Sequence, residues 1–130
     1  MINSNAYDYI NVLNKAADAS WLRESTLTNN VANVDTPGFK RKDVDFESVL
    51  NREIGNSKYT SLDTKVKKVN MNKLNATTYT DNASYSYRLD GNNVDIDQEE
   101  AKLASEQIRY TGLTDSMTQE INRMKMVLKS

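Results

Sequence analysis

The chain has 130 residues, of which 38% are hydrophobic and 27% charged, and its mean hydropathy of −0.73 lies toward the polar end for a globular protein. Its formal net charge of −1 gives no general attraction to nucleic acid or to an anionic membrane. Because the chain has no cysteine and no histidine, disulfide bonds, the usual zinc sites and histidine-based catalysis are excluded.

The first residues of the chain carry no recognisable targeting signal. They lack the basic and apolar regions of a cleaved secretory signal, and no stretch approaches ~18 consecutive apolar residues. We therefore expect no direct membrane insertion and no signal cleavage, so that any export from the cytoplasm would use another route.

The first long element is an N-terminal helix. Apolar residues recur at alternating spacings of four and three from Ile2 to Val34, in a coiled-coil-like seam that is interrupted at Arg23. The pattern predicts a helix over roughly residues 5–33, about 45 Å long at 1.5 Å per residue. The predicted packing residues of the seam are Leu13, Leu27 and Val31, and three residues widen the apolar face beside it: Ile10, Ala17 and Trp21.

The helical pattern stops at Thr36-Pro37-Gly38. Proline lacks the backbone N–H that a helix interior needs, and it biases Thr36 toward an extended backbone. Pro37 and Gly38 suit the two central positions of a type II turn, in which glycine takes a positive φ without strain. Asparagines just before the turn can bond side chain to backbone where the helix ends.

An extended segment follows the turn. Val44 and Phe46 alternate with charged residues over residues 39–46, which predicts extended chain along a surface. The bases at residues 40–42 are followed at once by acids, so a solvated or salt-bridged strand is favoured over a nucleic-acid patch. Phe46 and Leu50 are spaced for a short helix that would anchor both side chains in the core.

Residues 51–94 form a polar segment rich in Asn, Ser, Thr and Lys, with only isolated apolar residues. Strand-favouring residues gather at 65–69, 77–80 and 85–89. One or two β-hairpins, or a partly disordered arm, are the interpretations that this composition allows.

A second turn and a second long helix complete the chain. Asp90-Gly91 predicts the turn, and Asp97 with Glu100 predicts a capping box at the start of the helix. Gly91 is wrongly placed for a calcium-binding loop, so we interpret the nearby acids as helix-starting residues. The seam recurs over about residues 97–128, with packing residues Tyr110, Met117, Ile121, Met124 and Leu128.

These elements predict a mainly α fold, in which two long terminal amphipathic helices form an antiparallel coiled coil and the middle is extended, β-hairpin or partly disordered. The expected segments of this single structural domain are a coiled-coil helix (1–34), a turn and extended segment (35–50), a polar β/loop segment (51–94) and a second coiled-coil helix (95–130). Each helix has more apolar face than one partner covers, so we expect repeated subunits in a helical assembly. On the second helix the additional face consists of Ile108, Leu113 and Val127.

Two phrases of the sequence carry a family resemblance. Residues 29–40 read Asn-Asn-Val-Ala-Asn-Val-Asp-Thr-Pro-Gly-Phe-Lys. They resemble the signature of the bacterial flagellar basal-body rod and hook proteins: Asn-x-Ala-Asn, an acidic or polar residue, then Thr-Pro-Gly-aromatic, with Phe39 where tyrosine is often seen. Residues 39–46 and 87–97 are similar to aromatic-Lys-x-x-Asp-x-Asp-Phe and Tyr-Arg-x-Asp-Gly-Asn-x-Val-Asp-x-Asp of the short proximal rod subunit. The resemblance covers residues 1–50 and 84–130 and leaves 51–83 unmatched.

The resemblance implies a structural subunit of the proximal rod, the drive shaft of the flagellar basal body, which polymerises through its terminal helices and transmits torque. It implies that Phe46 and Leu50 form a candidate export-gate motif of the pattern Phe-x-x-x-apolar, beside the short-helix interpretation. The residues that it assigns to an assembly turn are Asn30, Ala32, Asn33, Asp35, Thr36, Pro37, Gly38 and Phe39.

The resemblance also implies partners and a location. The partners are the protein itself and other flagellar rod subunits, the rod adaptor, the basal MS ring and the flagellar type III export apparatus, with no cofactor and no nucleic acid. The location is the flagellar basal body in the cell envelope, within the periplasm of a two-membrane cell, after export without signal cleavage.

Other function classes have less support from the residues. An enzyme would need a carboxylate, Lys, Ser or Tyr mechanism, and neither a Gly-rich phosphate loop nor a nucleophile elbow occurs in the sequence. A nucleic-acid binder would need uncompensated bases interleaved with aromatics, which residues 65–68 alone do not provide. The alternatives that stay open are another flagellar rod or hook-family axial subunit, and a coiled-coil oligomerising adaptor unrelated to flagella.

Overall fold

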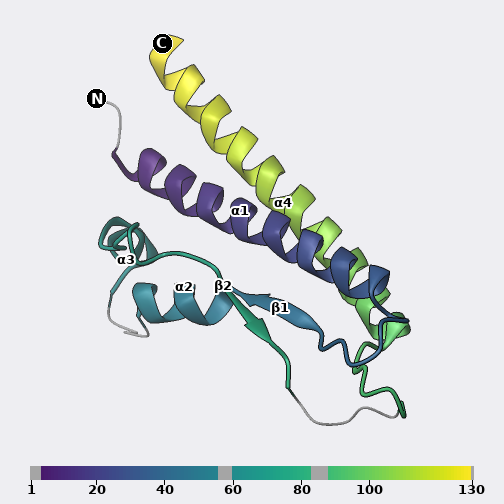
Figure 1. The fold of residues 1–130 in the computed structure, drawn as a ribbon. Coiled ribbons are helices and arrows are strands. Elements are labelled where there is room, and N and C mark those ends of the chain that lie inside the picture. Colours follow the sequence, from purple (N-terminus) through teal and green to yellow (C-terminus); the bar gives the residue numbers. More distant parts are fainter. Residues whose placement is uncertain (1–3, 56–59, 83–87, 130) are drawn as a thin grey trace.

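The computed structural model of the chain describes residues 4–55, 60–82 and 88–129. Two long helices dominate it, α1 over Ser4–Ala32 and α4 over Ile96–Lys129. They lie side by side and run in opposite directions, so that α1 begins near the end of the molecule where α4 finishes (Figure 1). The mainly α fold with an antiparallel pair of terminal helices is confirmed.

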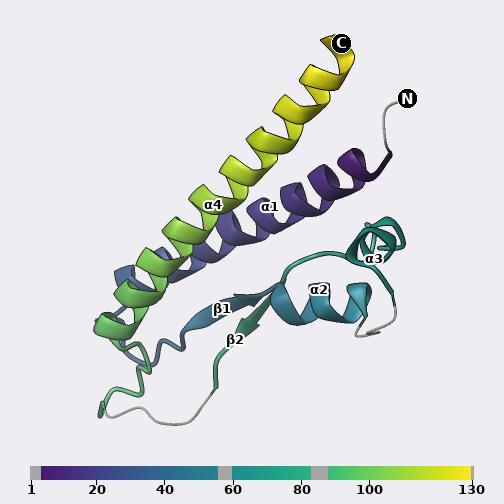
Figure 2. The same ribbon diagram turned by 180° about the vertical axis from the view of Figure 1, so that it is seen from behind.

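A second layer packs against α1 and runs along the helix pair (Figures 1 and 2). It consists of strand β1 (Lys42–Asp45), helix α2 (Glu47–Ile54), helix α3 (Leu62–Lys67) and strand β2 (Thr77–Thr80).

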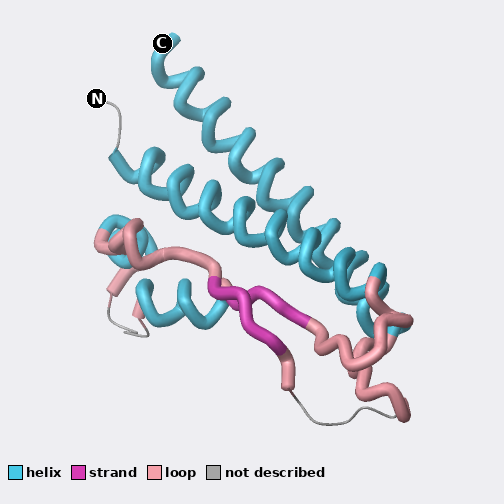
Figure 3. Tube along the Cα trace, in the orientation of Figure 1, coloured by secondary structure: helices cyan, strands magenta, loops and turns pink. Residues whose placement is uncertain are grey.

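The two strands form one antiparallel sheet (Figure 3), in which Val44 is paired with Thr78. The strand predicted at residues 77–80 is therefore present, and its partner comes from the extended segment that follows the first turn. Every residue of β2 is exposed, whereas Asp43 and Val44 of β1 are buried. β1 is thus the strand that ties the second layer to α1.

The strand predicted at residues 65–69 is wrong, because most of this stretch belongs to helix α3. Ser61 is the N-cap of α3 and accepts a hydrogen bond from the Thr64 amide at 3.3 Å. Asp63 lies in the first turn and two lysines in the last, where each complements the helix dipole. These local helix signals outweigh the strand propensity of Val66. The strand predicted at residues 85–89 falls largely outside the described residues.

The start of α4 also differs from the prediction, because the N-cap is Asp95 rather than Asp97. The Asp95 carboxylate accepts hydrogen bonds from the amides of Asp97 at 3.1 Å and Gln98 at 3.4 Å. Its backbone carbonyl accepts from the Glu99 amide at 2.9 Å, which is the first bond of the helix. The observed N-cap therefore lies two residues before the one that the sequence pattern predicts.

The core is small, as the composition predicts, and it is nearly as polar as it is apolar. Its hydrophobic members are Ala17, Ala19, Leu27, Val44, Val49, Val66, Leu74 and Val94. Its polar and charged members are Ser20, Asn30, Arg41, Asp43, Asn92, Glu99 and Glu106. Among the described residues, every buried side-chain nitrogen and oxygen has a hydrogen-bond partner. Partnered polar groups therefore occupy space that hydrophobic residues fill in most domains.

Candidate functional site

The two sequence phrases that carry the resemblance meet in the fold. In the first, Gly38 has φ +73° and the Phe39 amide donates to the Thr36 carbonyl at 3.2 Å, which is the turn that the sequence predicts. In the second, Gly91 has φ +79°. The Gly38 amide donates to the Asp90 carbonyl at 2.7 Å, and a Cβ atom added to Gly91 would lie 3.8 Å from the Gly38 Cα. We call the contact between residues 33–41 and 88–94 the junction.

Side chains from the second phrase bind the backbone of the first. The side-chain nitrogen of Asn92 donates to the backbone carbonyls of Asn33, Val34 and Thr36 at 2.9, 3.0 and 2.8 Å. Arg88 donates to the Val34 carbonyl as well and pairs with Asp90 at 3.1 Å. The end of α1 is therefore held by residues that directly precede α4.

The bonds of the junction also run outward to β1. The Asn93 amide donates to the Phe39 carbonyl at 3.3 Å, and the Asn93 side chain accepts from the Arg41 amide at 2.7 Å. Lys40 donates to the Gly91 carbonyl. The chain that leaves the first turn is thus paired with the second turn until β1 begins.

The residues of the predicted assembly turn divide into a buried group and an exposed group. Asn30 is fully buried, exchanges two hydrogen bonds with the backbone of Lys42 and donates to Glu99 at 3.0 Å. Asn33 and Phe39 are half-buried. The exposed members are Ala32, Asp35, Thr36, Pro37 and Gly38. The structure thus holds the turn largely through its backbone and leaves the side chains of Ala32, Asp35, Thr36 and Pro37 at the surface.

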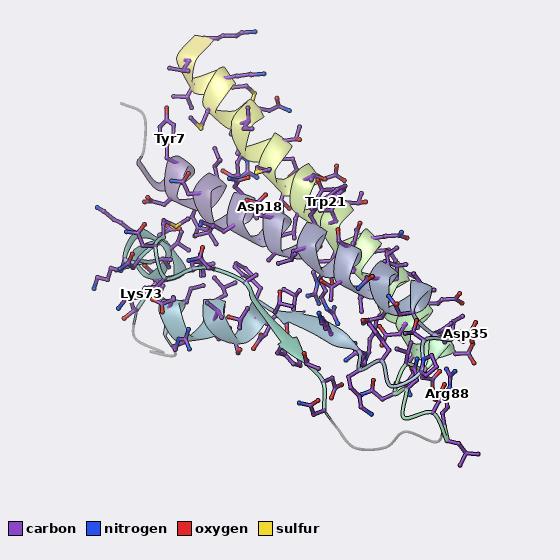
Figure 4. The ribbon with its side chains drawn as sticks, in the orientation of Figure 1. Tyr7, Asp18, Trp21, Asp35, Lys73 and Arg88 are labelled. Carbon is purple, nitrogen blue, oxygen red and sulfur yellow. The ribbon has the colours of Figure 1, made fainter. Side chains whose placement is uncertain are left out.

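Figure 4 shows where the junction lies in the molecule. Asp35 and Arg88 are at the same end, far from Tyr7 near the start of α1. The Asp35 side chain is 97% exposed, and its closest approach to the Arg88 guanidinium is a loose 3.9 Å. This carboxylate is therefore available to a partner.

A network of buried charges joins α1, β1 and α4 next to the junction. On α1, Arg23 donates to Glu106 at 2.7 Å and to Asp43 at 2.8 Å. Ser20 donates to the second oxygen of Glu106 at 2.6 Å. Asp43, on β1, also pairs with Arg41 at 3.0 Å. One continuous chain of polar contacts therefore crosses from the helix pair to the second layer.

Arg41 is the most connected member of this network. Its guanidinium binds three carboxylates: Asp43, Glu99 and, at 2.9 Å, Asp81. Glu99 in turn accepts from Asn30, which links the network to the predicted assembly turn. We call Ser20, Arg23, Asn30, Arg41, Asp43, Asp81, Glu99 and Glu106 the charge network.

The charge network keeps Asp43 ionised. Burial, which by itself raises the pKa of Asp43, is outweighed by hydrogen bonds from Arg23, the Val44 amide and Arg41. The pKa of Asp43 falls to about 2 as a result. The pKa of Arg23 is raised, chiefly by its hydrogen bond to Asp43. Ion pairs thus persist through the neutral range.

Most members of the charge network were not predicted from the sequence. From the sequence, Arg23 is interpreted only as an interruption of the first seam, and no interhelical role is assigned to Glu106. A signal was present, because Glu99 and Glu106 are one heptad apart and in register with Leu113, which lies on the apolar face beside the second seam. Charges of opposite sign on the apolar faces of two antiparallel helices indicate an interhelical pair.

A cleft of about 480 Å³ opens beside the charge network, between α1, α4 and the start of α2. Phe46 and Leu50, the candidate export motif, lie on its wall with Leu113 and Tyr79. Both are half-buried, and the Leu50 amide bonds the Phe46 carbonyl at 2.8 Å in the first turn of α2. The short helix predicted here is therefore present, and the export role stays a prediction.

The seam residues occupy different environments. Leu27 is fully buried between the helices and the second layer. Five are half-buried: Leu13, Val31, Tyr110, Met117 and Met124. Ile121 and Leu128 are exposed near the end of α4. Of the residues predicted to need further neighbours, Ala17 is already buried within the chain, whereas Trp21 is 60% and Ile108 75% exposed. Trp21 contacts Tyr110 across the helices, with ring centroids 5.9 Å apart.

Comparison with known proteins gives consistent matches. The family model described as "Flagella basal body rod protein" matches residues 10–40. The chain is 33% identical over 117 residues to the flagellar basal body rod protein FlgB of Bacillus subtilis, covering 89% of each chain. It is 34% identical to FlgB of Borrelia hermsii (95% of this chain, 93% of the relative) and 30% identical to FlgB of Escherichia coli (83% of each).

These matches correct one expectation. An alignment that covers 89% or 95% of the chain cannot omit residues 51–83, so the likeness extends through the middle segment that the two phrases leave unmatched.

Proposed function

The chain belongs to the family of flagellar basal body rod proteins, and on this premise we propose that it is a structural subunit of the proximal rod, which polymerises through its terminal helices and transmits torque. The observation that carries the proposal is the similarity to FlgB proteins over most of both chains. The junction adds support, because the two phrases shared with the family form one hydrogen-bonded unit.

The exposed apolar residues of the helix pair support polymerisation. Trp21 on α1 and Ile108 on α4 are large hydrophobic side chains that this chain leaves largely in water. A second group near the end of α4 comprises Ile121, Met126, Val127 and Leu128. Burial of such side chains stabilises by roughly 1.5–3 kcal/mol each, which favours contact with neighbouring subunits. A contact that is repeated without closing generates a tube.

The charge network supports the transmission of torque. A drive shaft needs outer segments that stay fixed to its inner helices under load. Arg23 and Arg41 join β1 to α1 and α4 through ion pairs that are largely shielded from water. In our proposal these pairs make the helices and the second layer turn as one body.

The proposed partners are other copies of the chain, other rod subunits, the rod adaptor, the basal MS ring and the type III export apparatus. The proposed location is the flagellar basal body, reached without signal cleavage. Within the described ranges, neither long helix combines the length and apolar content that crossing a membrane requires.

The test is deletion of the gene in its flagellated host, followed by electron microscopy of isolated basal bodies. Basal rings without a rod, restored by a plasmid-borne copy, are the expected result. A proximal rod that lacks only its distal part would favour a different axial subunit. Normal rods and normal swimming would refute a rod function.

A second test measures self-association directly. Ile108→Ser removes an exposed apolar group and should change the free energy of unfolding by less than about 0.5 kcal/mol. We expect it to weaken self-association in analytical ultracentrifugation. Gln107→Ser, at an exposed polar neighbour, is the matched control. A wild-type chain that stays monomeric at high concentration would argue against polymerisation through the helices.

A further inference from the structure

The end of α1 has no left-handed glycine just past its last turn. Helix ends leave carbonyl groups without intrahelical partners, and many helices satisfy them with a glycine in the left-handed region just past the last turn. Here α1 ends at Ala32, and the first glycine with positive φ is Gly38. No other described residue between them has a positive φ. The carbonyls of Asn33 and Thr36 accept one local bond each, from the amides of Thr36 at 3.0 Å and Phe39 at 3.2 Å, and each keeps a second acceptor site for a donor from elsewhere.

Asn92 supplies such donors from a distant part of the chain. Its side-chain nitrogen donates to the carbonyls of Asn33, Val34 and Thr36, which lie between the end of α1 and Gly38. The Asn92 residue is 1% exposed, so water cannot take its place. One side chain thus binds three carbonyls of the connection, of which that of Val34 also accepts from Arg88.

Asn92 is in turn tied to the start of α4. Its side-chain oxygen accepts a hydrogen bond from the Val94 backbone amide at 2.8 Å. Its backbone N–H donates to the Asp90 carboxylate at 3.1 Å. Asp95, the N-cap of α4, is three residues further on. The position of the Asn92 side-chain amide is therefore set by the residues at the beginning of α4.

We propose that Asn92 is the positioning residue of the assembly turn, through which α4 sets the path of the chain that leaves α1. The turn takes its assembly-competent form only when the start of α4 is docked, so a chain with an undocked C-terminal half does not present the turn to a partner. This inference rests on the proposed role of the turn in rod assembly. It adds a residue outside the Thr-Pro-Gly phrase and a dependence of that phrase on residues more than fifty positions later.

Asn92→Asp gives the sharpest perturbation. A carboxylate has the same shape as the amide, but it only accepts hydrogen bonds and would face three carbonyl oxygens. The local reporter is the Gly38 amide, which bonds the Asp90 carbonyl at 2.7 Å. Loss of a buried donor corresponds to about tenfold to hundredfold faster hydrogen exchange at Gly38. Amides in α3, remote from the junction, should keep their wild-type rates.

Two controls separate positioning from loss of stability. Asn122→Asp adds the same charge at an exposed position of α4 and should leave exchange at Gly38 unchanged. Val66→Ala removes buried apolar atoms from α3 and lowers overall stability without touching the junction. Asn92→Ala removes the donors without adding charge and provides a milder variant to match against Val66→Ala in urea unfolding.

The assembly readout is restoration of swimming and of rods in a strain that lacks the gene. We expect Asn92→Ala to fail and the stability-matched Val66→Ala to succeed. Equal failure of both would reduce Asn92 to a stability role and overturn the inference, as would normal Gly38 exchange in Asn92→Asp or full assembly by that variant. If the wild-type gene itself does not restore rods, the proposed function fails, and the exchange experiment still decides whether Asn92 positions the turn.

Discussion

Replacing Arg41 with alanine tests whether the charge network contributes more to stability than an ordinary surface ion pair does. Arg41 is 7% exposed and binds three carboxylates, of which Glu99 is 1% exposed. Removing the guanidinium leaves Asp43 with Arg23 and the Val44 amide, and leaves Glu99 with a single neutral donor, Asn30. Breaking a buried pair in this way destabilises by about 3–5 kcal/mol, because an uncompensated charge stays in a poorly solvated place.

A loss of that size is large for this protein. Domains are stable by about 5–15 kcal/mol, and the apolar core here is small. We therefore expect Arg41→Ala to be partly or wholly unfolded at 25 °C. Urea unfolding followed by far-ultraviolet circular dichroism measures the difference as a shift of the midpoint at unchanged slope.

The matched control is Arg123→Ala. Arg123 pairs with Glu120 at 2.8 Å, a distance like those of the network, but the arginine side chain is 66% exposed. Such a pair one helical turn apart contributes only about 0.2–0.5 kcal/mol. If the two substitutions lowered the free energy of unfolding by similar amounts, the reasoning from burial would be refuted.

Four further predictions concern pH and glycine. The folded pKa of Asp43, about 2, lies below the unfolded value. Its contribution of roughly 2 kcal/mol is therefore complete above pH ~4 and is lost as the pH falls through 2, so Asp43→Asn should flatten the acid limb of stability against pH. The hydrogen bond to Asp63 raises the pKa of Tyr9 to about 12. Asp63→Asn should return it toward 10 in a phenolate absorbance titration. Gly38→Val, at φ +73°, should block assembly more than export in a swimming and secretion assay, and normal swimming would contradict the turn assignment. Gly112→Ala, in mid-helix with open space around it, should instead raise stability by ~1 kcal/mol in urea unfolding.

The long helices and the first turn could be predicted from the sequence because their causes are local. The seam spacing reports which face of a helix is apolar, and α1 and α4 begin and end within one residue of the predicted positions. Proline and glycine restrict their own backbone angles, so the turn at residues 36–39 needs no distant partner to be recognised. The secondary structure of the middle segment was harder to predict, because a single buried valine in α3, Val66, does not distinguish a strand from a helix.

The remaining structure depends on which distant groups meet. Whether Arg41 is a solvated base or the centre of a buried network depends on three acids, two of them at least forty residues away. The pairing of β1 with β2 also depends on residues far apart in the sequence, and so does the binding of Asn92 to the end of α1. By itself, the sequence determined the two long helices, the turns and the family, since each rests on neighbouring residues or on a contiguous phrase. Only the tertiary structure decided how the two phrases join and how the charges are paired, because a buried polar group is stable only where a complementary partner is brought within hydrogen-bond distance.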